Sequence, residues 1–219
     1  MGFSMTTTPT ILIHGLHQNR YAMYPLAYRL KKDGFTVHCH GYHCLKDGIA
    51  THSEGLNHWL NIHHNPNAPL NFVAHSLGGL VLRDFIARYP KWQIGRAVTL
   101  GTPHQGSLCA DYTKRLIPWL IGKSYEGALD GHCLPLPEGV DIGVIAGNKP
   151  YGLGLPFLLY HQYKHGIKND HDGTVFLSES ILPTTSDYLV MPVTHSGFLT
   201  NKKVAKQVGY FLQNGCFLR

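Results

Sequence analysis

The stretch Asn71-Phe72-Val73-Ala74-His75-Ser76-Leu77-Gly78-Gly79-Leu80-Val81 decides the fold predicted for this chain. An apolar run leads into a serine with small residues close by, and an apolar run compatible with a helix follows. This order predicts a strand, a sharp turn and a helix, with the serine hydroxyl exposed above the end of a sheet. Such a turn needs small residues two positions before and two positions after the serine, because other backbone passes close there. Ala74 and Gly78 occupy those positions, so the usual first glycine is replaced by the next smallest residue.

Strands and helices alternate along most of the chain. The predicted strands cover residues 10–13, 35–39, 70–74, 96–100, 141–146 and 188–193. The predicted helices cover residues 21–32, 49–64, 77–89 and 201–213. The strands are near-continuous apolar runs, which is typical of a parallel sheet that is covered on both faces. The pattern therefore predicts an α/β fold with a mostly parallel central sheet and helices on both faces.

The length of 219 residues favours one domain that spans residues 1–219. Between residues 105 and 139 the alternation fails, and the segment contains several prolines, glycines and large apolar residues. We interpret residues 105–139 as a small cap-like insertion that passes over the sheet. Residues 147–170 form a second irregular stretch with many apolar side chains.

Charge and cysteine content narrow the class of protein. The formal charge is +6, and the lysines and arginines are scattered along the chain. This pattern predicts no nucleic-acid partner and at most a weak peripheral contact with a membrane. Five cysteines without a tight framework argue against a disulfide-stapled secreted scaffold. Residues 1–9 lack the features of a signal peptide, so we expect a cytoplasmic location. The sequence does not indicate an oligomeric state.

Ser76 needs a base to take its proton and an acid to orient that base. In α/β sheets such residues follow the carboxyl ends of strands, in the chain order serine, acid, histidine. His195 follows the predicted strand at residues 188–193, and is our candidate for the base. Asp172 lies in the polar loop after residues 141–146, and Asp170 lies two positions before it. We favour Asp172 over Asp170 as the acid, because the glycine that follows it frees the backbone.

A serine that attacks a carbonyl group also needs amide groups that hold the developing oxyanion. The backbone amide of Leu77 is one candidate, because it lies at the start of the predicted helix that follows the serine. The second candidate is the amide of Leu16, in the loop after the first strand. Gly15 precedes it and lets that loop approach Ser76 closely.

With these residues in place, the chain resembles lipase/esterase-type α/β hydrolases over nearly its whole length. The resemblance is carried by segments around the residues described above: 13–16, 74–79, 100–107, 172–175 and 195–197. It implies an α/β-hydrolase fold and the cleavage of small-molecule or lipid esters without a cofactor. It also implies that Ser76, Asp172 and His195 are the catalytic residues, with Leu16 and Leu77 as oxyanion amides.

Several alternatives remain open at this stage. The same residues could serve a thioesterase, an amidase or an acyltransferase, and a binding protein could keep the fold without turnover. The cap is short, so we expect short to medium acyl chains to be preferred. Some apolar residues of the two irregular stretches are candidates for contacting the substrate: Leu108, Ile117, Trp119, Leu153 and Phe157.

A run of histidines and cysteines at residues 38–44 has the side chains that zinc prefers. It begins inside a predicted strand, where alternate residues face opposite sides of the sheet. We therefore predict no metal site.

Overall fold

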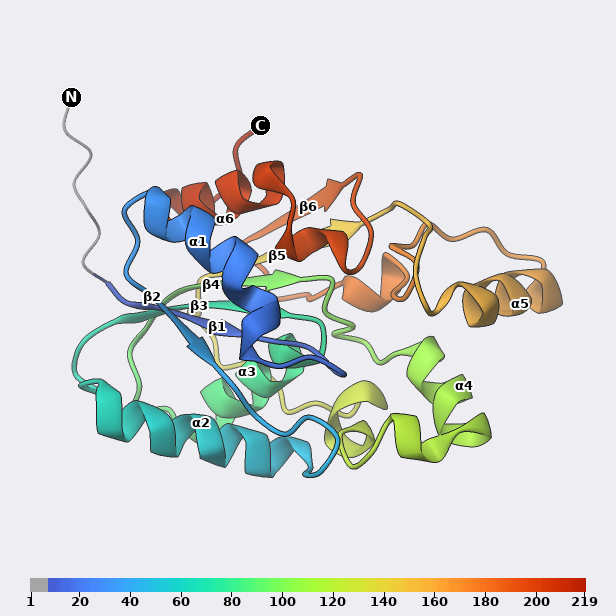
Figure 1. Cartoon of the computed structure of the whole chain (residues 1–219), viewed down its shortest axis with the longest axis horizontal. Coiled ribbons are helices and arrows are strands. Elements are labelled where there is room, and N and C mark those ends of the chain that lie inside the picture. Colours follow the sequence, from blue (N-terminus) through green and yellow to red (C-terminus); the bar gives the residue numbers. More distant parts are fainter. Residues whose placement is uncertain (1–7) are drawn as a thin grey trace.

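The structure is a computed structural model that describes residues 8–219, and its centre is a six-stranded sheet (Figure 1). All neighbouring strands are parallel, and their order is β2-β1-β3-β4-β5-β6. The strands are β1 (Thr10–Ile13), β2 (Val37–His40), β3 (Leu70–His75), β4 (Ile94–Leu100), β5 (Ile142–Gly147) and β6 (Asp187–Met191). The predicted α/β fold with a parallel sheet is confirmed. The prediction that residues 1–9 are not a signal peptide concerns residues that lie mostly outside the described range.

The described part of the chain contains six α-helices: α1 (Tyr24–Lys32), α2 (Ile49–His63), α3 (Leu77–Arg88), α4 (Leu108–Leu116), α5 (Leu155–His165) and α6 (Lys202–Asn214). Short helical turns lie between them: η1 (Arg20–Met23), η2 (Pro118–Leu120), η3 (Tyr125–Leu129), η4 (Ser178–Ser180) and η5 (Gly197–Leu199). Figure 1 shows α1 and α6 on one face of the sheet and α2 and α3 on the other. The predicted two-sided cover is therefore present.

The two faces of the sheet bury separate hydrophobic clusters. Leu12 of β1 and Val73 of β3 pack with residues of α1 and α6. Ile11 and Phe72, one position earlier in the same strands, pack with residues of α2 and α3. All four side chains are fully buried, and burial of each contributes roughly 1.5–3 kcal/mol. Because both faces are covered, successive strand residues are all apolar, which explains the continuous apolar runs in the sequence.

Some element boundaries differ from the prediction for local reasons. The helix predicted at residues 21–32 is divided into η1 and α1, and Pro25 stands in the first turn of α1. Proline is compatible with that position because it needs no hydrogen-bond acceptor for a backbone N–H there. The second strand begins at Val37 and not at Phe35, because the Phe35 amide donates to Leu30 and closes the end of α1.

Two helices lie in the part of the chain where the alternation of strands and helices fails, and we call α4 and α5 the cap. Helix α4 lies in the predicted insertion at residues 105–139, but α5 lies within residues 147–170, which we expected to be irregular. The two helices are in contact, and the rings of Tyr112 and Phe157 stack with 5.6 Å between centroids. Helix α5 was missed because it buries little of its surface, so its sequence lacks the apolar period of a packed helix. In Figure 1 both helices lie at the right-hand end of the molecule.

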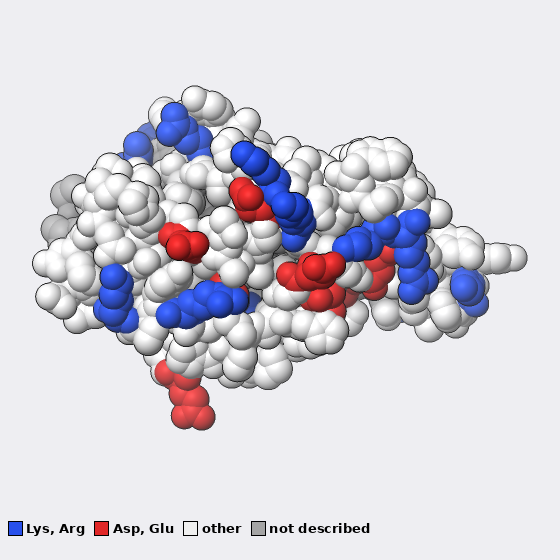
Figure 2. Space-filling model, turned by 90° about the horizontal axis from the view of Figure 1, so that it is seen from below, with Lys and Arg blue, Asp and Glu red and all other residues white. Residues whose placement is uncertain are grey.

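Charged side chains are mixed on the surface. Figure 2 shows lysines and arginines interspersed with aspartates and glutamates on one face of the molecule. Within the described part of the chain, no helix combines the length and the apolar character needed to cross a membrane.

Candidate active site

Ser76 lies at the sharp turn between β3 and α3, as predicted. Its backbone has a φ of 53° and a ψ of −124°, and a positive φ is rare for a residue with a side chain. Two hydrogen bonds hold this conformation from neighbouring segments. The Ser76 amide donates to the carbonyl oxygen of Leu100 at 2.9 Å, and the Thr102 hydroxyl donates to the Ser76 carbonyl oxygen at 3.0 Å. The strained turn is therefore fixed by β4 and the loop that follows it.

Close packing explains the small residues around the serine. A Cβ atom on Gly78 would lie 2.5 Å from the carbonyl oxygen of His14 and 2.6 Å from that of Ile13. A Cβ atom on Gly15 would lie 3.0 Å from the Cβ of Ser76. Gly78 is thus required by the approach of β1 and its loop to the turn, and a side chain at Gly15 would press against Ser76. Ala74 has room for its methyl group at the end of β3, where it is fully buried.

The structure brings Ser76, His195 and Asp172 together from three separate loops. The Ser76 Oγ lies 2.9 Å from Nε2 of His195, and Nδ1 of His195 lies 2.7 Å from Oδ2 of Asp172. Because the carboxylate can only accept, Nδ1 of His195 carries the proton and Nε2 is free to accept from the serine hydroxyl. The three side chains form a continuous hydrogen-bonded chain that ends on a buried carboxylate.

Asp172, and not Asp170, faces the histidine. Oδ1 of Asp172 accepts from the amides of Thr174 and Val175 at 2.9 and 2.8 Å, which leaves Oδ2 for His195. The amide of His195 also donates to the carbonyl oxygen of Asp172 at 2.8 Å, so the two loops are joined twice. Asp170 is exposed to solvent.

The loop after β1 lies beside the serine turn. Leu77 is the first residue of α3, and the side chain of Leu16 packs against the cluster that contains Leu77. Two side chains hold the loop that precedes Leu16. Gln18 accepts from the Gly15 amide at 2.9 Å, and the ring of His14 stacks on that of Tyr42 with 4.3 Å between centroids. These contacts hold the loop that contains Gly15 and Leu16 beside the turn of Ser76.

Glu179 is a partly buried residue that the sequence did not single out. It accepts from the amide of Leu108 at 2.6 Å and from the amide of Phe176 at 2.8 Å. It therefore joins the start of α4 to the loop that carries Asp172. Burial raises the pKa of Glu179 to about 7, with smaller contributions from Asp172 and Asp111, although its two backbone hydrogen bonds oppose the shift. Nothing in the sequence around residue 179 distinguishes it from a surface glutamate.

The apolar residues expected to contact a substrate differ in exposure. Leu153 is 97% exposed and Trp119 is 72% exposed, so neither is enclosed by the cap. Leu108 and Phe157 are partly buried and pack on the cluster of Cys109, Leu158 and Phe176 beside the Asp172 loop. These two are therefore the better placed to line a substrate pocket.

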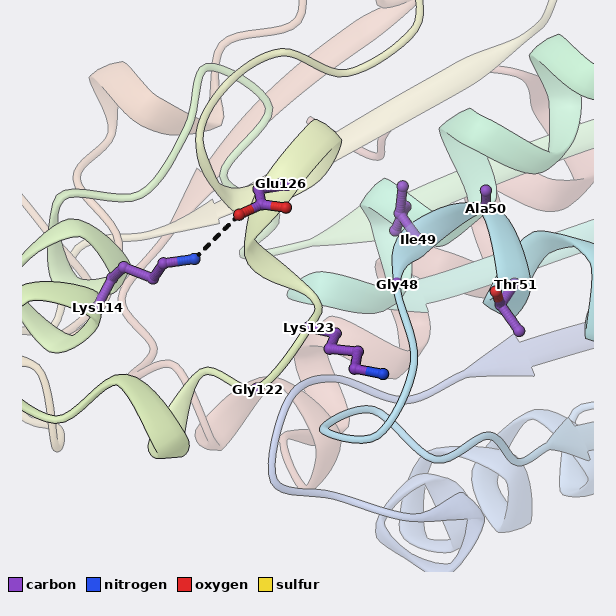
Figure 3. Close-up of a pocket in the computed structure, with 8 residues that line it drawn as sticks. All are labelled: Gly48, Ile49, Ala50, Thr51, Lys114, Gly122, Lys123 and Glu126. Atoms are coloured by element: carbon purple, nitrogen blue, oxygen red, sulfur yellow. Dashed lines mark hydrogen bonds and ion pairs between the residues drawn. The ribbon is translucent and has the colours of Figure 1, made fainter.

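A separate pocket of about 410 Å³ lies between the start of α2 and the segment that contains Lys123 and Glu126 (Figure 3). Its lining does not include Ser76, His195 or Asp172. An ion pair between Lys114 and Glu126 lies at one side of it.

The histidines and cysteines at residues 38–44 lie partly on β2 and partly in the loop after it. His38 and His40 are two positions apart and face the same side of the sheet, where both rings approach Trp59, whereas Cys39 faces the other side. Within residues 8–219, no group of three or more His, Cys, Asp or Glu side chains could hold a metal ion.

The chain is similar in structure to several solved proteins. Lipase BlEst2 of Bacillus licheniformis, in its mature form, is 19% identical with a TM-score of 0.72, and the match covers 95% of this chain and 92% of that one. A metagenomic carboxyl esterase is 17% identical with a TM-score of 0.67, and the match covers 89% and 66% of the two chains. Methylketone Synthase I of tomato is 13% identical with a TM-score of 0.57, and the match covers 95% and 97%. No protein-family model matches this chain.

These similarities establish the architecture. The chain has the α/β-hydrolase fold, and lipases and esterases are among the solved proteins that share this architecture. Since the neighbours differ in the activities that their names state, the fold does not select the reaction.

Proposed function

We propose that this protein is a serine hydrolase that cleaves carboxylic esters through an acyl-Ser76 intermediate. The observation that carries the proposal is the hydrogen-bonded chain from Ser76 Oγ through His195 to the buried Asp172. Ser76 lies on a strained turn between a strand and a helix, which is the position of a nucleophilic serine in this fold. The lipases and esterases among the structural neighbours add support.

The proposed reaction uses each residue in a defined role. Nε2 of His195 takes the proton of Ser76 as Oγ attacks the ester carbonyl carbon. The amides of Leu16 and Leu77 donate to the oxyanion that forms. The imidazolium then gives its proton to the leaving alcohol, and the acyl group stays on Ser76. In the second half, His195 takes a proton from a water molecule as that water attacks the acyl carbonyl carbon. The bond from this carbon to Oγ then breaks, His195 returns the proton to Ser76, and the carboxylic acid leaves.

Asp172 supports the base in both halves of this cycle. Its Oδ2 orients the ring of His195 so that Nε2 faces the serine, and its charge stabilises the imidazolium. Two backbone amides hold its other oxygen, so the carboxylate is fixed before substrate binds. No cofactor is needed for these steps.

The same residues could act on a thioester or an amide, or could transfer the acyl group to an alcohol in place of water. All of these substrates share the acyl-Ser76 intermediate, so the first experiment should test that intermediate. We expect a fluorophosphonate probe to label the purified protein at Ser76, and p-nitrophenyl esters to be hydrolysed. A protein that is not labelled and does not hydrolyse any ester of the series would favour a binding function of the same fold.

A further inference from the structure

The buried histidine next to the nucleophile has no role in the reaction described above. The side chain of His75 is 1% exposed, and its Nε2 lies 2.9 Å from the backbone carbonyl oxygen of His195. Its Nδ1 lies 3.1 Å from Oε1 of Gln18. The rings of His75 and His195 lie 4.9 Å apart between centroids. His75 therefore contacts both the residue proposed as base and the loop of Leu16.

The protonation state of His75 follows from its surroundings. Burial, together with the neighbouring His195, lowers the pKa of His75 to about 3, so the ring is neutral near pH 7 and carries one N–H. Both partners of the ring are oxygen atoms, and the carbonyl oxygen of His195 can only accept. Oε1 of Gln18 already accepts from the amide of Gly15. The contact of Nε2 with the His195 carbonyl oxygen is shorter than the contact of Nδ1 with Oε1 of Gln18, and Oε1 already accepts another hydrogen bond. Both observations place the proton on Nε2.

We propose that His75 is a positioning residue for His195, and that its Nε2–H sets the place of the base relative to the serine by donating to the His195 carbonyl oxygen. His75 is joined to Ser76 by one peptide bond. The backbone of His195 is thus hydrogen-bonded to His75, and its imidazole is hydrogen-bonded to Oγ of the neighbouring Ser76. These bonds and the peptide bond form a closed ring of contacts.

This ring of contacts matters because Ser76 and His195 come from distant parts of the chain. Ser76 and His195 are 119 residues apart, and His195 lies in a loop after the edge strand β6. Small errors in the position of a catalytic group lower reaction rates strongly. A direct bond between the backbone of the base and the residue before the nucleophile fixes the two loops against each other. The inference rests on the proposed function, since it assigns a role toward the proposed base.

Two substitutions of His75 separate this bond from general packing. In His75→Gln the side-chain NH₂ reaches about as far as Nε2 of the imidazole, so a donor to the His195 carbonyl oxygen is kept. In His75→Asn the NH₂ reaches only as far as Nδ1, so the donor is lost. Both replacements are polar and uncharged, which makes each a control for the other.

We expect His75→Asn to lower kcat for a p-nitrophenyl ester by about tenfold, which corresponds to roughly 1.4 kcal/mol, and to change KM by less than about twofold. We expect His75→Gln to keep most of the wild-type kcat. Equal values of kcat for the two variants would overturn the proposal, and so would a loss that appears in KM alone. Thermal unfolding of both variants shows whether they fold.

A second measurement needs neither a variant nor turnover. In the wild-type protein at pH 7, NMR correlation of the imidazole nitrogens and ring protons should show His75 as the Nε2–H tautomer. The Nδ1–H tautomer would overturn the proposal even if His75→Asn fails to fold. Turnover that survives in Ser76→Ala would instead contradict the proposed function, and the tautomer measurement would still test the hydrogen bond.

Discussion

At the scale of single residues, the unusual backbone of Ser76 is the feature with the clearest energetic cost. A residue with a side chain at a φ of 53° and a ψ of −124° is strained by about 1–3 kcal/mol. The hydrogen bonds from Thr102 and to Leu100 maintain this conformation. Stability is thus lost at the position where the proposed chemistry needs an exposed hydroxyl group.

The backbone strain at position 76 and the need for its hydroxyl group can be measured with two substitutions of Ser76. We expect Ser76→Ala and Ser76→Gly each to lower the rate of ester hydrolysis by about a million-fold, because the nucleophile is gone. Glycine tolerates a positive φ, so Ser76→Gly should be more stable than Ser76→Ala by about 1 kcal/mol in urea unfolding. A Ser76→Ala variant that keeps a few per cent of the activity would show that another group is the nucleophile.

The two neighbouring aspartates give a matched pair for testing the acid. Asp172→Asn should lower kcat by roughly 10⁴-fold, because an amide at this position favours the wrong tautomer of His195. Asp170→Asn should change kcat by less than about threefold, because Asp170 is exposed and the hydrogen bond to His195 comes from Asp172. Steady-state kinetics on one p-nitrophenyl ester would check both, and a larger loss for Asp170→Asn would reverse the assignment.

At the scale of elements, Glu179 connects the cap to the acid loop. It accepts from the first residue of α4 and from Phe176, four residues after Asp172. Its carboxyl group is raised in pKa from 4.5 to about 7, chiefly by burial. The folded protein therefore binds more protons at this group than the unfolded chain does between about pH 4.5 and pH 7.

The contribution of Glu179 to the free energy of unfolding therefore falls as the pH rises through this window. We expect the unfolding free energy of the wild type, relative to that of Glu179→Gln, to be larger at pH 5 than at pH 8. Urea unfolding at the two pH values measures this difference. The same comparison with the exposed Glu138→Gln should show little change with pH. The raised pKa would be contradicted if the free energy of unfolding of the wild type, relative to that of Glu179→Gln, increased from pH 5 to pH 8.

The cap helices also set an expectation for substrate size. Helix α5 buries only Leu158 among its residues, and Leu153 just before it is almost fully exposed. Such a cap can form one wall of a pocket but encloses little volume. We expect rates on p-nitrophenyl esters to be highest for short to medium acyl chains and to fall beyond about twelve carbons. A rate that keeps rising with chain length, or that jumps at an oil–water interface, would contradict this.

The same elements show what could and could not be predicted from the sequence. The sheet, its two-sided cover and the loops of Ser76 and His195 are each encoded by a local pattern, so the sequence located them. Helix α5 and the role of Glu179 depend on tertiary contacts with the cap and the acid loop. Those contacts leave no period or motif in the sequence, because α5 buries little surface and Glu179 is an isolated residue in a loop.

At the scale of the whole molecule, the proposed reaction relies on groups that the chain itself supplies. We expect ester hydrolysis by the purified protein to proceed without added metal and to be unchanged by EDTA, because a triad and oxyanion amides require no Lewis acid. Rates before and after dialysis against the chelator are the measurement. Activity that is lost in EDTA and returns with zinc would give the histidines and cysteines at residues 38–44 a role after all.

The position of His195 also has a consequence for the timing of synthesis. Ser76 and its turn leave the ribosome early, but His195 follows β6, the last strand to be made and one that needs β5 as its template. A nascent chain that has not released residue 195 holds the proposed nucleophile without the proposed base. The ester hydrolysis that we propose therefore requires synthesis to have passed β6 and the loop that carries His195.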